Sequence, residues 1–343
     1  MIIFSGISQV RLAASGKSLP NPVKIAETIH APKKTSNGYL TTLSGVWAEF
    51  VQNDISKPVS YVGKFQFSRI LIFKKMVSER TKAIFYKFVI ADLGVEGQCC
   101  SGTETNTATC ISTHEEGKCT SYSRTISILN RKCELGAREQ MNGATAFLDA
   151  STVYGNSLDT ANQLRTFEGG LLRTSFGDLL PVDHSCDMFN NNSNKSNCVE
   201  SGDARVNESP ALMVLHTLFV RQHNRLAAKL ARVNSMWDDE TLYQETRRLV
   251  TAQIQHVTYR EFLPAVLGEN LAENLKLTPK LAGHFSGYDI DAYPGTLEAA
   301  ALAALSFSLA MLPAKFETFT MVSDWQMTAD RTRTDFKKIK IKC

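Results

Sequence analysis

Two oppositely charged residues, Arg205 and Glu208, stand three positions apart in the run GDARVNESP, directly before a stretch with helical periodicity. A guanidinium and a carboxylate placed there can form a capping and salt-bridge pair at a helix entrance. The same two groups can instead serve a reactive site, because arginine stays charged and a carboxylate accepts protons or hydrogen bonds. The sequence around Arg205 and Glu208 indicates which of these two interpretations applies.

The elements that would position these residues are two long helices. From Pro210 to about Val233 the apolar residues recur at three- and four-residue steps, which places on one helical face Leu212, Leu215, Leu218, Phe219, Leu226 and Leu230. Pro210 suits a first helical turn, where its missing N–H is no loss. A second helical pattern starts after Asp238 and Asp239, acidic residues that stabilise a helix N-terminus, and ends near Gly268. The predicted fold is therefore mostly α.

This region resembles a known family. The pattern GDxRxNExPxLxxxHTLxxRxHNR, followed by WDDExLYQExRR, is similar to that of the animal haem peroxidases. The resemblance implies a helical domain in which Arg205 lies on the distal side of the haem and polarises bound peroxide, and in which Glu208 can form an ester to a haem methyl. It also implies haem as the cofactor, and hydrogen peroxide with a small phenolic or halide reductant as partners.

The stretch Leu43–Ile55 is helical by pattern and falls where the family carries GQFxDHDI on its distal helix. Matched in register, Ala48 stands for Gly, Glu49 for Gln, Gln52 for the haem-esterifying Asp, Asn53 for the distal His and Asp54 for a calcium-binding Asp. The distal His moves a proton between the peroxide oxygens, which needs a group that titrates near neutral pH. Asn53 cannot do this. Glu49 lies on the same helical face, so its carboxylate can act as the base if burial raises its pKa. The alternative for Glu49 is a surface or calcium-shell acid.

A second departure from the family pattern lies in the apolar stretch Thr296–Leu312, which predicts a buried helix. The stretch is shorter than the roughly 18 to 20 apolar residues that a membrane span needs. This stretch matches the family's AAFRFGHSLxP, whose His is the proximal iron ligand, and the match places Leu309 at that His. A leucine has no lone pair, so the usual bond between protein and haem iron cannot form there. The other histidines near helical or loop structure are predicted to be solvated or core residues: His216, His223, His256 and His284.

The segment 138–155, REQMNGATAFLDASTVYG, resembles the family's calcium-binding loop. By position, the resemblance implies as ligands the Thr145 hydroxyl and carbonyl, the Phe147 carbonyl, and the side chains of Asp149, Ser151 and Asp54. This is a set of hard oxygen ligands of the kind that calcium prefers. The alternative is a turn rich in Asp, Ser and Thr with ordinary side-chain caps.

Composition indicates a folded, disulfide-bearing protein. A net charge of +4 over 343 residues gives no reason to invoke nucleic acid or an acidic membrane. Five of the eight cysteines lie between Cys99 and Cys133, and sequons at Asn191 and Asn194 lie between Cys186 and Cys198. These features favour an extracellular glycoprotein, with an extracellular protein as a possible partner, although the N-terminus is no signal peptide.

The resemblance covers roughly residues 1–58 and 95–317 of one partial domain, incomplete at both ends, with 60–94 as an unmatched insertion and 318–343 as an unmatched tail. Two functions compete. The preferred hypothesis is a catalytically degenerate relative kept as a calcium-stabilised scaffold, because Asn53 and Leu309 replace both histidines. The alternative is an active haem peroxidase whose gene model is incomplete or misjoined. A non-functional fragment with an uncovered apolar surface is a third possibility.

Overall fold

The computed structural model describes residues 13–17, 28, 40–59, 110–112, 119–121, 126–128, 139–183, 198–297, 300, 304–312, 318–323 and 326–330. The chain divides into two compact units. One comprises Met1–Ser36, Pro58–Gly143 and Ala314–Cys343, and the other comprises Asn37–Lys57 and Ala144–Pro313. The sequons and the unmatched stretch 60–94 lie outside the described residues.

The described part of the first unit carries antiparallel hairpins, whose strands are β1 (Cys110–Ser112), β2 (Cys119–Ser121), β3 (Ser127–Ile128), β4 (Glu139–Gln140), β5 (Thr318–Ser323) and β6 (Gln326–Asp330). The strands pair as β1 with β2, β3 with β4, and β5 with β6. The last hairpin falls within the tail that the sequence left unmatched.

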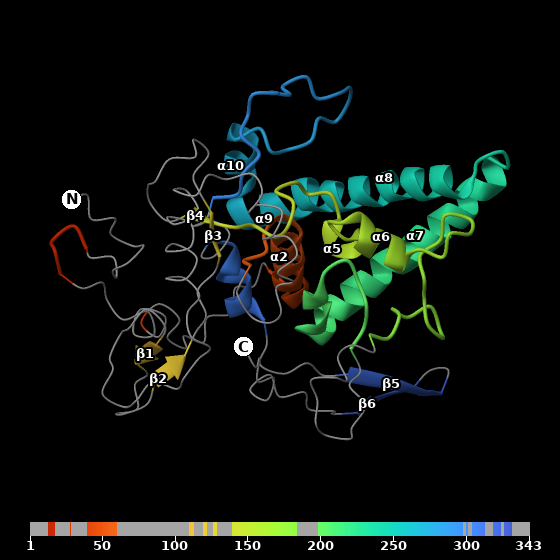
Figure 1. Ribbon diagram of the computed structural model, residues 1–343, viewed down its shortest axis with the longest axis horizontal. Helices are drawn as coiled ribbons and strands as arrows, with labels where there is room; N and C mark the ends of the chain where they lie inside the picture. Colours follow the sequence, from red (N-terminus) through yellow and green to blue (C-terminus); the bar gives the residue numbers. More distant parts are fainter. Residues whose placement is uncertain are drawn as a thin grey trace, which may run out of the picture. The chain divides into compact units, whose positions relative to one another are not determined.

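The second unit is helical and holds every residue singled out for chemistry. Its elements are α2 (Thr42–Ile55), α5 (Ser151–Tyr154), α6 (Leu158–Leu164), η2 (Ala204–Asn207), α7 (Pro210–Val233), α8 (Asp239–Val257), η3 (Thr258–Phe262), α9 (Leu263–Leu267), α10 (Glu269–Asn274) and η5 (Leu305–Met311). Figure 1 shows α7 and α8 as a long helical hairpin, with the shorter helices α5 and α6 beside it. The predicted, mostly α architecture is confirmed.

The two long helices begin where their capping residues predict. The Ser209 hydroxyl accepts a hydrogen bond from the Leu212 N–H at 3.1 Å, and Pro210 occupies the first turn of α7. At α8 the Asp238 carboxylate accepts from the Thr241 N–H at 2.8 Å. The helical path runs from α8 through the π-helical segment η3 into α9, and ends before Gly268, whose φ of 85° is readily adopted only by glycine.

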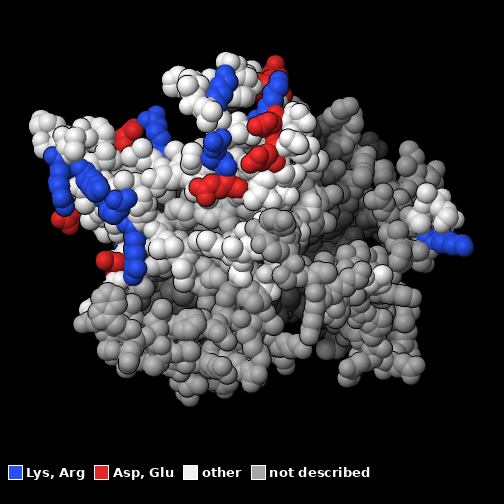
Figure 2. All heavy atoms as spheres, turned by 180° about the vertical axis from the view of Figure 1, so that it is seen from behind, with Lys and Arg blue, Asp and Glu red and all other residues white. Residues whose placement is uncertain are grey.

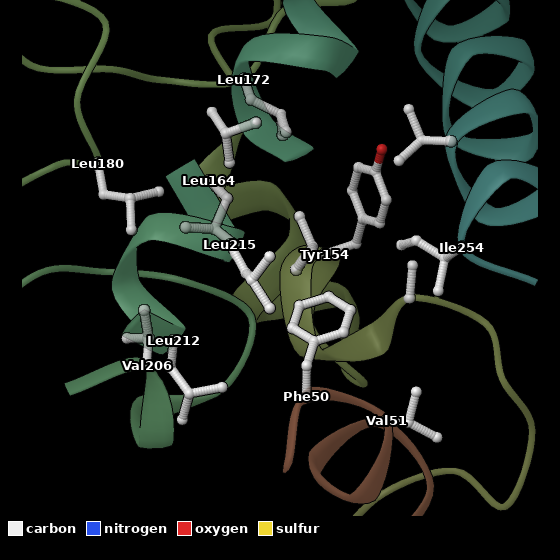
Figure 3. Packing of buried hydrophobic residues seen from close by; sticks show 14 of the residues in the cluster. Phe50, Val51, Tyr154, Leu164, Leu172, Leu180, Val206, Leu212, Leu215 and Ile254 are labelled. Carbon is white, nitrogen blue, oxygen red and sulfur yellow. The ribbon is translucent and has the colours of Figure 1, made fainter. Parts of the chain in front are cut away.

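The core of the second unit forms where α2, α5, α7 and α8 meet. Figure 3 shows Phe50 of α2 and Tyr154 of α5 between Leu215 of α7 and Ile254 of α8. The Trp47 indole N–H donates to the Thr258 hydroxyl at 3.3 Å, which links α2 to η3 across 211 residues. Helix α2, which carries Glu49 and Asn53, is therefore packed against several other elements.

Two local expectations were wrong. Leu218 is 52% exposed, because the buried face of α7 runs instead through Leu212, Leu215, His216, Val220, His223 and Ala227. The described part of the predicted helix 296–312 is a 3-10 helix, Leu305–Met311, and Leu297 near its start is 76% exposed. No helix in the described ranges has the length and apolar composition needed to cross a membrane.

Candidate functional site

Arg205 fastens the 3-10 turn η2 to the end of α2. Its Nε and Nη2 donate to the Asp203 carboxylate at 2.9 and 3.0 Å. Nη1 donates to the Ser56 carbonyl at 2.8 Å, and Nη2 donates to the Asn53 carbonyl at 2.9 Å. Carbonyls at the C-terminal end of a helix lack partners within the helix, so a cation placed there satisfies and stabilises them. The guanidinium is thus largely committed to protein groups.

Asp203 is the counter-ion that holds Arg205 in this position. Burial alone would raise the pKa of Asp203, but hydrogen bonds and charge from Arg205 hold it well below its usual range. The Lys57 ammonium, 3.0 Å from the carboxylate, acts in the same direction. The Asp203 carboxylate also accepts the Arg205 N–H at 2.9 Å and caps η2. This buried carboxylate therefore stays ionised across the physiological range.

The sequence suggested a pair between Arg205 and Glu208, and the structure gives Arg205 a different partner. The salt bridge runs to Asp203, two residues before Arg205, and α7 is capped by Ser209. Burial raises the pKa of the Glu208 carboxyl, while the charge of Arg205 lowers it. Glu208 therefore lies within electrostatic reach of Arg205 without forming its principal ion pair.

Glu49 and Asn53 lie on α2 and are both buried, with side chains that carry unsatisfied polar atoms. Glu49 is 7% exposed and Asn53 is 5% exposed. Within the described residues, Glu49 Oε2 and Asn53 Nδ2 have no hydrogen-bond partner. Burial, then the charge of Glu208, raises the pKa of Glu49 to about 7, against the opposing effect of Arg205. For Glu49 to act as an acid–base group, burial has to raise the pKa of its carboxyl, and burial does so here.

The segment that carries Leu309 packs directly against α2. A Cβ at Gly45 would lie 3.0 Å from the Met311 Cβ and 3.4 Å from the Ser308 carbonyl oxygen. The backbone of η5 therefore approaches α2 so closely that only glycine avoids a contact there. Position 309 lies on η5, and its leucine brings no atom that can donate electrons to a metal.

Of the four described histidines, two are buried and two are exposed, and the buried Nε2 of His216 has no hydrogen-bond partner among the described residues. His223 is fully buried, with Nδ1 2.9 Å from the Tyr154 hydroxyl and Nε2 2.8 Å from the Gly170 carbonyl. His216 is fully buried too, with Nδ1 2.7 Å from the Ser201 hydroxyl and its ring edge-on to Phe50. Burial lowers the pKa of each to about 4. The predicted core role holds for these two, whereas His256 and His284 are exposed.

Residues 149–152 of the segment matched to the calcium loop lie beside Asp54. Its carboxylate is fully buried and accepts hydrogen bonds from the N–H groups of Ala150 at 3.0 Å and Thr152 at 2.9 Å. The Ser151 hydroxyl lies 3.3 Å from the same carboxylate. Burial raises the pKa of Asp54 to about 6, and the nearby Asp149 charge adds to the rise although the backbone hydrogen bonds oppose it. The Asp149 carboxylate therefore lies within electrostatic reach of the buried Asp54 carboxylate.

Hydrogen bonds within the loop join the other residues of the matched set to one another. The Thr145 hydroxyl donates to the Phe147 carbonyl at 3.2 Å, and Asp149 accepts the Ser151 N–H at 3.0 Å. Among the described residues no cluster of three or more His, Cys, Asp or Glu side chains could hold a metal. The calcium set contains two carboxylates, with hydroxyl and carbonyl oxygens as its other members, so such a cluster is not required for it.

Two features of the site were missed from the sequence. Asp203 was passed over although it stands two residues before Arg205 in the same motif. The buried hydrogen bonds that His223 forms with Tyr154 and Gly170 join residues 69 and 53 positions apart. The first had a local indication in the sequence, whereas the second depends on tertiary packing.

Comparisons with known proteins place this chain beside one family. The family model described as animal haem peroxidase matches residues 4–340. A chorion peroxidase of Aedes aegypti is 39% identical over 202 residues, 56% of this chain and 24% of that protein. A peroxidasin homologue of Caenorhabditis elegans is 31% identical over 312 residues, 86% of this chain and 22% of that protein. The chain thus spans under a quarter of either relative.

A solved structure, peroxidase A from Dictyostelium discoideum, has a similar fold. It aligns with a TM-score of 0.60 and 21% identity, covering 94% of this chain and 57% of that one. At this identity the likeness concerns the fold alone.

Proposed function

Since the chain belongs to the animal haem peroxidase family, we propose that it is a calcium-stabilised, extracellular scaffold of that family with impaired peroxidase chemistry. The proposal rests on the match to the family's sequence patterns, which assigns Asn53 and Leu309 to the positions of the proton-transferring and iron-binding histidines. Family relatives reduce hydrogen peroxide at haem iron and then oxidise a small reductant. Neither substituted side chain supplies the proton transfer or the iron bond.

The residues present do not fit a histidine-ligated haem. Leucine offers only carbon at position 309, and the ring nitrogens of His216 and His223 are enclosed by the core. Direct packing of Gly45 against Met311 closes the space between α2 and η5 at that point. Arg205 directs most of its N–H groups to Asp203 and to the carbonyls of α2 rather than toward a ligand.

Under this proposal the chain retains a structural role that depends on calcium. Calcium at Asp54, Thr145, Phe147, Asp149 and Ser151 would neutralise the buried Asp54 and Asp149 carboxylates and tie α2 to the 145–151 loop. An extracellular location is supported by Cys198, which is disulfide-bonded, as expected in an oxidising compartment. The partner of such a scaffold would be another extracellular protein.

Spectroscopy of the full-length chain tests the loss of peroxidase chemistry. After reconstitution with haem we expect no Soret band and no peroxide-dependent oxidation of guaiacol. The variant Leu309→His tests whether the missing ligand is the cause, and Leu309→Gln is its matched control. A stoichiometric five-coordinate haem spectrum with turnover in the unaltered chain would overturn the proposal.

A second candidate, an active peroxidase, is favoured by one observation, the Glu49 pKa of about 7. A carboxyl that titrates near neutral pH can take up and return a proton, as the distal histidine does. Its partners would then be hydrogen peroxide and a small reductant. In this case guaiacol oxidation would be present and would disappear in Glu49→Gln but not in Glu245→Gln, a surface carboxylate on α8.

A further inference from the structure

The outer face of α7 carries a row of four cations. Arg221, Arg225, Lys229 and Arg232 follow one another at steps of four, four and three residues, and all four are exposed. At 100° per residue these steps keep the side chains within an arc of about 80° and spread them over roughly 16 Å of helix. We call these four residues the α7 basic row.

The charges in this row are not neutralised by acids of the described region. Arg221 donates to the carbonyls of Gly177 and Asp178 at 2.8 and 2.9 Å, which fixes its position and leaves its charge intact. Arg225 donates to the neutral Gln222 amide at 2.7 and 3.0 Å. Within the described ranges no salt bridge to an Asp or Glu involves any of the four.

The row is a local concentration of charge in a chain whose net charge is only +4. Figure 2 shows Lys and Arg side chains gathered along the left edge of the view, the side on which the α7–α8 turn lies, with isolated acidic side chains beside them. Since the opposite face of α7 is buried in the core, only this face is open to a partner. The helix therefore presents its cations on a rigid support.

A row of exposed cations along one helix fits a linear polyanion as the ligand. The neighbouring side chains on the same face of α7 indicate which class of polyanion binds. Arginine binds sulfate and phosphate oxygens through paired N–H groups, and three of the four cations are arginines. Single-stranded nucleic acids are usually held by several aromatic side chains stacked on successive bases. The positions of α7 in line with the row are Val214, Leu218 and Ala228, and the exposed Phe176 precedes the Gly177 carbonyl that Arg221 binds, at one end of the row. A sulfated sugar chain carries repeated charge without bases, so it needs no such platform.

We propose that the α7 basic row binds a sulfated glycosaminoglycan chain. The binding surface lies on α7 and uses none of the residues placed in the haem or calcium positions. A failure of either function proposed above would leave it unaffected.

Binding of a heparin dodecasaccharide to the full-length chain, measured by fluorescence anisotropy over a range of salt concentrations, tests this inference. The variant Arg225→Gln/Lys229→Gln/Arg232→Gln removes three charges and spares Arg221, which holds the 177–178 loop. The control Arg247→Gln/Arg248→Gln/Arg260→Gln removes three positive charges from α8 and η3. Circular dichroism of both variants checks that the helices are intact.

We expect the row variant to bind on the order of tenfold more weakly, because each surface charge contributes modestly. The slope of log Kd against log salt should fall by roughly 2, because about 0.7 counterions are released per neutralised charge. The control should retain most of the affinity. Equal losses in the two variants, undiminished binding of desulfated heparin, or tighter binding of single-stranded DNA or anionic vesicles would overturn the proposal.

Discussion

Replacing Asp54 by asparagine tests the calcium site through the pH dependence of stability. Asp54 is fully buried, and burial raises the pKa of its carboxyl from 3.8 to about 6. Between these two values the folded chain binds more protons than the unfolded chain. Without calcium, the stabilisation is therefore complete below pH 3.8 and is lost as the pH rises through 6.

The size of this change in stability follows from the shift in the pKa of Asp54. About two pKa units at 1.36 kcal/mol each correspond to about 3 kcal/mol of stability lost between pH 4 and pH 7. The amide introduced by Asp54→Asn does not titrate, so this variant should lack that part of the pH dependence. Calcium binds the ionised carboxylate, so it should restore the stability of the unaltered chain at pH 7 and leave the variant nearly unchanged.

The assay is urea unfolding of both proteins at pH 4 and pH 7, each with EGTA and with calcium. Because other groups titrate in the same range, the informative quantity is the difference between the two proteins at each pH. Asp178→Asn, at an exposed loop position, serves as the control for removal of a carboxylate. The reasoning is refuted if the difference between the unaltered chain and Asp54→Asn is the same at both pH values, or if calcium stabilises the variant equally.

Two further substitutions probe the buried polar contacts of the helical unit. Arg205→Met should destabilise the chain by about 3–5 kcal/mol, because it leaves the Asp203 carboxylate buried and short of its main partner. Arg248→Met on the surface of α8 should cost at most about 0.5 kcal/mol, and similar costs for the two variants in urea unfolding would disprove the role of Arg205 in joining η2 to α2. His223→Phe should cost about 3 kcal/mol by stranding the Tyr154 hydroxyl and the Gly170 carbonyl. The unaltered His223, with its pKa lowered from 6.5 to about 4, contributes stability above pH 6.5 that is lost as pH falls through 4, and His223→Phe should lose this acid sensitivity in thermal melts.

The helices of the second unit were largely predictable because their determinants are local. A proline at position 210 and apolar steps of three and four residues predicted α7 at its observed bounds. Asp238 did the same for the start of α8. Periodicity alone could not tell which apolar residues face inward, and Leu218 proved to be exposed because helices from distant parts of the chain determine the buried face.

At the candidate site, the sequence alone determined which side chains are present: Asn53 brings no group that titrates near neutral pH, and Leu309 brings no atom that can bind a metal. Tertiary structure decided what the retained residues do. Arg205 contacts carbonyls about 150 positions away, and Glu49 acquires a near-neutral pKa from burial beside Glu208. Chemical identity is a property of each residue, whereas charge state and hydrogen-bond partners depend on the solvent exclusion and long-range contacts that only the folded chain creates.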